Sequence, residues 1–183
     1  MKGIKEKAFS VEHQFFFARI PNIMYRLQAV QELPISIEKA WDFYSNPKNL
    51  AVITPDNLGF QIRTDLPDRM YPGMMIVYTV KPLLGIPMTW VTEITQMRQN
   101  ELFIDEQRIG PYQMWHHQHI FEEIDGGVRM TDIVDYQLPL APFGNIGHFV
   151  VKGELKKIFG YRVRKTEELF GKKGEADLRF FSF

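Results

Sequence analysis

The chain has 183 residues, of which 45% are hydrophobic and 14% aromatic, which is enough for one well-buried domain and short for two. Its 22 Lys and Arg residues balance 22 Asp and Glu residues, so no net field attracts nucleic acid or an anionic membrane, and we predict neither as a partner. The absence of cysteine excludes disulfides, thiolate nucleophiles and cysteine zinc sites, and favours the cytoplasm.

Residues 1–23 show no sustained strand or helix periodicity, and we predict that they form an N-terminal extension with little regular structure. The apolar stretch 15–18 is too short for an export signal. Every long apolar run is broken by charge or proline before the roughly 20 residues that a membrane span needs. The predicted domain covers residues 24–171, and residues 172–183 form a tail to which we assign no role.

The domain begins with a strand and two short helices. Side chains alternate over residues 25–33, as in a half-buried strand, and Pro34 ends it. Ser36 stands where a hydroxyl can cap a helix, and apolar residues follow it at helical spacing up to Tyr44. A second short helix is predicted over residues 48–53.

The following hundred residues have the pattern of an antiparallel meander. Six strands are predicted, joined by turns rich in glycine and proline: 59–66, 74–81, 88–98, 101–109, 113–124 and 128–138. A broad apolar stripe then predicts a long helix over residues 143–170. The fold class is therefore α+β, with a curved seven-stranded antiparallel sheet around a long C-terminal helix.

Strands between residues 90 and 136 place aromatic and ionisable side chains on one face. Alternation puts the following residues on that face: Trp90, Phe103, Asp105, Gln107, Trp115, His117, His119, Phe121, Asp132 and Tyr136. An ordinary core would be almost purely apolar, because each unpaired buried polar group costs about 1 to 3 kcal/mol. Polar groups among aromatic rings are typical of a small-molecule cavity, so we predict that these ten residues contact a ligand.

Two other interpretations of this face stay open. The histidines and Asp132 could lie on the solvent side of the sheet, although the opposite face carries more charge. Alternatively, the two histidines could be buried and hydrogen-bonded to Asp105 or Asp132 as a structural network, which is compatible with a cavity.

Metal and nucleophile chemistry have weaker support. The spacing of His117 and His119 suits metal ligands, but it matches the first cupin motif poorly, and no second ligand motif has the required spacing. We predict no metal and no other cofactor. The chain also lacks a Gly-x-Ser-x-Gly nucleophile motif and a phosphate-binding glycine loop.

Several motifs resemble one known superfamily. They are the run from Pro34 to Phe43, Asn46-Pro47, Phe103-x-Asp105-x-Gln107, Trp115-x-His117-x-His119-x-Phe121 and Asp132-x-Val134-x-Tyr136. Together with the order of elements, they are similar to the helix-grip fold of the SRPBCC superfamily, also called Bet v 1-like or START-like, in its uncharacterised bacterial ligand-binding branch. This resemblance implies the fold more strongly than the function, because the superfamily includes carriers, receptors, polyketide cyclases and oxygenase domains.

The leading hypothesis is a protein that binds or carries a small apolar or amphipathic molecule. The first alternative is an enzyme of the cyclase or dehydratase type, with His117 or His119 as general base and Asp132 or Tyr136 as partner. A protein-interaction module is the second alternative. The sequence does not indicate the ligand, any catalysed reaction or the oligomeric state.

Overall fold

The computed structural model describes residues 23–81, 85–139 and 144–183. The predicted extension therefore lies almost entirely outside the described residues. Among the described residues, no helix is both long enough and apolar enough to cross a membrane.

The first strand and its helices follow the sequence prediction closely. Strand β1 (Tyr25–Leu33) has alternately buried and half-buried side chains. The Ser36 hydroxyl accepts a hydrogen bond from the Lys39 amide and caps helix α1 (Ile37–Tyr44). Two 3-10 helices follow, η1 (Pro47–Ala51) and η2 (Asp56–Leu58), the first of which corresponds to the second predicted helix.

Most strands of the meander agree with their predicted limits to within about one residue. They are β3 (Met75–Val80), β4 (Met88–Arg98), β5 (Leu102–Ile109), β6 (Met114–Ile124) and β7 (Gly127–Gln137). The strand predicted at 59–66 is shorter than expected, because only β2 (Gln61–Ile62) pairs with β3.

The sheet has eight strands, so the predicted count of seven is wrong. Residues of the predicted tail form β8 (Lys173–Ser182), which pairs antiparallel with β1 and completes the order β2-β3-β4-β5-β6-β7-β1-β8. This strand lies at the sheet edge and is largely exposed along its length. Edge strands tolerate charged side chains on both faces. Such a strand lacks the alternation of apolar and polar residues from which strands are predicted, so β8 was missed.

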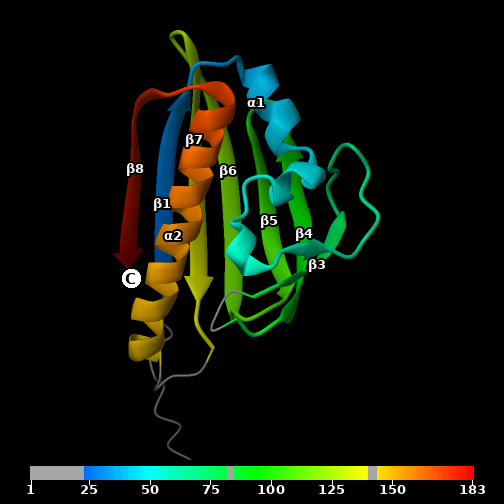
Figure 1. Ribbon diagram of the computed structural model, residues 1–183, viewed down its shortest axis with the longest axis vertical. Coiled ribbons are helices and arrows are strands. Elements are labelled where there is room, and N and C mark those ends of the chain that lie inside the picture. The colour runs from blue at the N-terminus through cyan, green and yellow to red at the C-terminus, as the bar shows by residue number, and fades with distance from the viewer. Residues whose placement is uncertain (1–22, 82–84, 140–143) are drawn as a thin grey trace, which may run out of the picture.

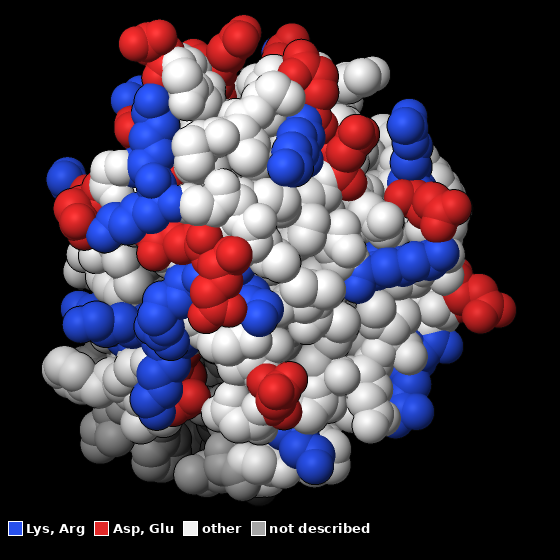
Figure 2. Space-filling model, turned by 45° about the horizontal axis from the view of Figure 1, so that its top comes forward, with Lys and Arg blue, Asp and Glu red and all other residues white. Residues whose placement is uncertain are grey.

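Helix α2 (Gly144–Phe170) lies across one face of the sheet, and α1 and the 3-10 helices lie on the same side (Figure 1). The apolar face of α2 packs through Val151, Leu155 and Phe159 against side chains of β1 and β7. This arrangement confirms the α+β helix-grip architecture, a curved antiparallel sheet around a long C-terminal helix. Figure 2 shows Lys, Arg, Asp and Glu side chains interspersed on one face of the surface.

Candidate functional site

Strands β5, β6 and β7 bring four ionisable side chains together on the inner face of the sheet. The register pairs Asp105 with His117 and His119 with Asp132. Residues two apart on a strand share a face, so the histidines also lie side by side, with ring centroids 3.8 Å apart. Both histidines and Asp132 are buried, so their inward orientation is confirmed and the solvent-facing interpretation is wrong.

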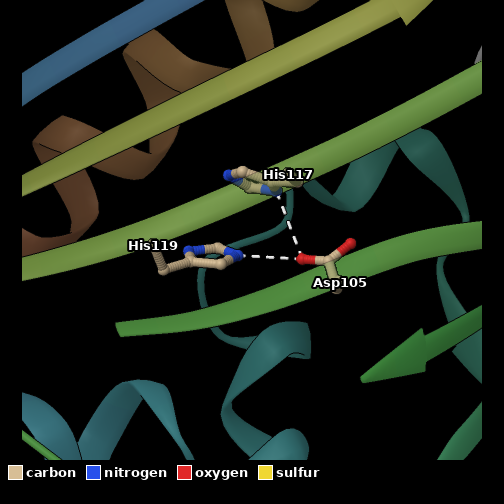
Figure 3. Close-up of side chains that lie close together, drawn as sticks. All are labelled: Asp105, His117 and His119. Carbon is tan, nitrogen blue, oxygen red and sulfur yellow. Dashed lines mark hydrogen bonds and ion pairs between the residues drawn. The ribbon is translucent and has the colours of Figure 1, made fainter. Parts of the chain in front are cut away.

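Each histidine lies between the two carboxylates. His117 Nε2 is 3.0 Å from Asp132 Oδ1, and His119 Nε2 is 2.9 Å from Asp105 Oδ2, both with hydrogen-bond geometry. The remaining ring nitrogens are at ion-pair distance, 3.3 Å from Asp105 for His117 and 2.8 Å from Asp132 for His119. Figure 3 shows both rings directed at one oxygen of Asp105. We call these four residues the His–Asp cluster.

The His–Asp cluster holds its charges in a buried environment. Burial alone would raise the pKa of Asp105 and Asp132, but the facing histidines outweigh it and hold both pKa values well below the ordinary range. Burial would likewise lower the pKa of His117, yet Asp105 and Asp132 outweigh it and the pKa is raised. The direction of this shift favours the protonated form of His117, in which both ring nitrogens are donors.

Three members of the cluster could hold a metal ion. Asp105, His117 and His119 each offer one ligand atom, and these atoms lie within 4.8 Å of one another. Two histidines and one carboxylate suit a divalent transition metal. Coordination would require His117 to lose the proton that the carboxylates stabilise, so metal and proton would compete. The expectation that no metal binds here stays a prediction.

A cavity of about 160 Å³ lies beside the cluster, between the sheet, α2 and the short helices. Aromatic side chains provide much of its wall. Trp90 packs edge-on against Trp115, and Tyr78 stacks on Trp90. Such a cavity, mostly apolar with a few buried polar groups, has the character of a small-molecule site.

Six of the ten residues predicted to contact a ligand line this cavity. They are Trp90, Phe103, Asp105, Trp115, His117 and His119. The structure brings these six together as the alternation predicted, on neighbouring strands of one sheet face. Whether they contact a ligand stays a prediction.

The other four predicted residues lie away from the cavity wall. The Gln107 amide instead bonds to the backbone of Tyr112 in both directions, at 2.7 and 3.2 Å. Phe121 packs edge-on against Trp41 in the core. Asp132 lies beyond the histidine pair, where it lines a second, very small cavity. Tyr136 is fully buried and stacks on Tyr25.

Sequence reasoning missed the part of the cavity wall that other elements provide. The cavity-lining residues that were not predicted lie on α1 and the turn after it, η1, β3 and α2. They include Tyr44, Asn49, Tyr78, Phe159 and Arg162. Arg162 is buried although it is charged, and it is absent from the predicted site. One signal was present, because Leu155, Phe159, Arg162 and Thr166 repeat at the spacing of a single helix face.

Comparisons with known proteins support the fold. No protein-family model matches the sequence, and neither does any curated protein. Protein Ms6760 from Mycobacterium smegmatis superposes with a TM-score of 0.57 at 18% identity, covering 79% of this chain and 89% of its own. TTHA0849 from Thermus thermophilus superposes with a TM-score of 0.58 at 16% identity, covering 78% of this chain and 94% of its own. Ara h 8.0201 superposes with a TM-score of 0.54 at 16% identity, covering 79% of this chain and 99% of its own. At these identities the likeness shows a shared fold.

Proposed function

We propose that this protein binds a small, largely apolar molecule in the cavity between the sheet and α2, and that it serves as a binding or carrier protein. The observation that carries the proposal is the aromatic wall of Tyr78, Trp90 and Trp115 around about 160 Å³ of space, with the His–Asp cluster at one side. The shared fold with Ara h 8.0201, a homologue of Bet v 1, supports this proposal and the proposed membership of the SRPBCC superfamily.

The cavity volume limits the size of the ligand. An apolar cavity of about 150 Å³ accommodates a molecule the size of benzene. We therefore expect a compact ligand with one ring or a short branched chain. Apolar contact provides most of the binding free energy, at about 25 cal/mol for each Å² of apolar surface removed from water.

Binding of small neutral aromatic probes tests the proposal directly. Toluene, benzyl alcohol and cinnamyl alcohol are titrated into the protein while tryptophan fluorescence is recorded, since Trp90 and Trp115 line the cavity. Native mass spectrometry of freshly purified protein shows whether a molecule is already present. The proposal fails if no probe binds and the purified protein carries none.

A cavity-filling variant separates this site from the surface. Val80 is buried in the cavity wall, so Val80→Phe places a phenyl group in the ligand volume and is expected to weaken probe binding about tenfold or more. Val150 on α2 is 52% exposed, so Val150→Phe makes the same change away from the cavity. Equal binding by both variants would place the probes elsewhere.

The His–Asp cluster favours one second candidate, an enzyme that uses acid–base chemistry. The two carboxylates raise the pKa of His117 and so favour its protonated form, which suits a general acid better than the general base predicted from sequence. The hydroxyl of Tyr136 lies outside the cavity wall, so Asp105 is the better partner. This candidate requires that His117→Asn abolishes turnover of a bound substrate while its binding persists; parallel loss of binding and folding would contradict it.

A further inference from the structure

Arg162 presents a cationic side chain to the cavity from the helix side. It lies one helical turn after Ile158 on α2, and both residues line the cavity. The residue is only 9% exposed, which is unusual for arginine. Its neighbour Arg164 is exposed on the same helix, so helix position alone does not force Arg162 inward.

The guanidinium of Arg162 forms no ion pair with the residues that the structure describes. Among the residues that the structure describes, its Nε atom has no hydrogen-bond partner. Within the same described part of the chain, Asp105 and Asp132 form their ion pairs with the histidines and none with Arg162. The guanidinium lies over the Phe159 ring at 4.9 Å, which offsets part of the cost of burial.

A second donor in the cavity wall is also without a partner. The indole Nε1 of Trp90 is buried and has no acceptor among the described residues. Asp105, the carboxylate of the wall, is already held by two histidines. The cavity thus offers unused hydrogen-bond donors, and a ligand that complements it must bring an acceptor.

We propose that the ligand of this cavity is a small organic acid, whose carboxylate pairs with Arg162 while its apolar part packs against the aromatic wall. The inference rests on the proposed binding function and names its ligand class. A planar guanidinium matches a carboxylate with two parallel hydrogen bonds, and this pair is stronger where water is excluded. The volume of about 160 Å³ selects a compact acid with a single ring.

Matched acids and alcohols test the charge preference. Benzoate and cinnamate are compared with benzyl alcohol and cinnamyl alcohol, which have the same ring and no charge, by titration calorimetry at pH 7. We expect each acid to bind about 10- to 100-fold more tightly than its alcohol. In Arg162→Met that preference is expected to fall to about twofold or less, while the alcohols keep their affinity. Arg164→Met is the matched control and retains the preference.

Each result of this experiment is decisive. Alcohols that bind as tightly as acids, or a preference that survives in Arg162→Met, overturn the assignment of Arg162 and leave the binding function intact. Failure of both probe sets to bind a wild-type protein that carries no molecule of its own overturns the binding function together with the inference. An Arg162→Met protein that loses alcohol binding and unfolds at lower temperature would show that Arg162 is structural, and Arg162→Gln provides a second, polar variant for that comparison.

Discussion

Two buried sets of charge face each other across the interior of this protein, and they differ in how they are satisfied. On the sheet, the His–Asp cluster places every carboxylate at ion-pair distance from both histidines, although His119 Nδ1 makes no hydrogen bond among the described residues. On the helix, Arg162 has an Nε atom without a partner among the described residues. Folding alone accounts for the first set, because paired charges stabilise one another. The second set costs stability in the empty protein, which is the expected character of a group that serves a ligand.

The largest expected effect is the loss of a carboxylate from the paired set. Asp132→Ala removes a buried carboxylate that both histidines contact and leaves their ring nitrogens without this partner, so we expect the free energy of unfolding to fall by about 3 to 5 kcal/mol. Denaturant unfolding monitored by circular dichroism measures this change. Asp68 is an exposed carboxylate paired with Lys48, and Asp68→Ala is expected to change stability far less, because solvent screens an exposed pair. Similar losses in both variants would contradict the contrast between buried and exposed pairs.

Removal of the buried charge on the helix, that of Arg162, should raise stability instead of lowering it. Arg162→Met removes a buried cation and keeps an unbranched apolar chain, so the free energy of unfolding of the empty protein is expected to rise by about 1 to 3 kcal/mol. The midpoint of thermal unfolding reports the same change, and Arg164→Met is expected to leave it unchanged. A clear loss of stability in Arg162→Met would mean that the guanidinium is satisfied within the protein.

A polar group on the same sheet face as the cluster provides an intermediate case. Gln107 is fully used by the backbone of Tyr112, so Gln107→Ala is expected to lower the free energy of unfolding by about 1 to 2 kcal/mol. Probe affinity is expected to change by less than about twofold, since this side chain lies outside the cavity wall. Calorimetric titration of Gln107→Ala with cinnamyl alcohol measures this affinity. A large loss of affinity would support the sequence prediction that Gln107 contacts the ligand.

The smallest expected effect is a pH dependence. The raised pKa of His117 adds stability that is complete below the unfolded-state value of about 6.5 and is lost as pH rises through the folded-state pKa. The lowered pKa values of Asp105 and Asp132 add stability above about pH 3.9 that is lost in acid. We expect the stability difference between wild type and His117→Asn to shrink as pH rises from 6 to 8. A constant difference would show that His117 does not hold an extra proton.

The sheet face of the candidate site was predictable because strand geometry is local. Side chains two residues apart share a face, so Asp105, His117 and Trp115 could be assigned to one wall from alternation alone. Alternation does not show how far along the strand the cavity extends. Three predicted residues lie on these strands but contact the protein itself. Gln107 bonds to the backbone, Phe121 packs in the core, and Tyr136 stacks on another tyrosine.

The sequence by itself determined the element order, the limits of most strands, the cap at Ser36 and which residues of each strand share a face in the His–Asp cluster. All of these depend on periodicity and short-range hydrogen bonding, and both are set by residues that are close together in the sequence. Only the tertiary structure decided that residues 173–182 form β8 beside β1, and that Arg162 meets the aromatic wall. Both depend on contacts between segments far apart in the chain, where a side chain's surroundings come from packing and not from local pattern.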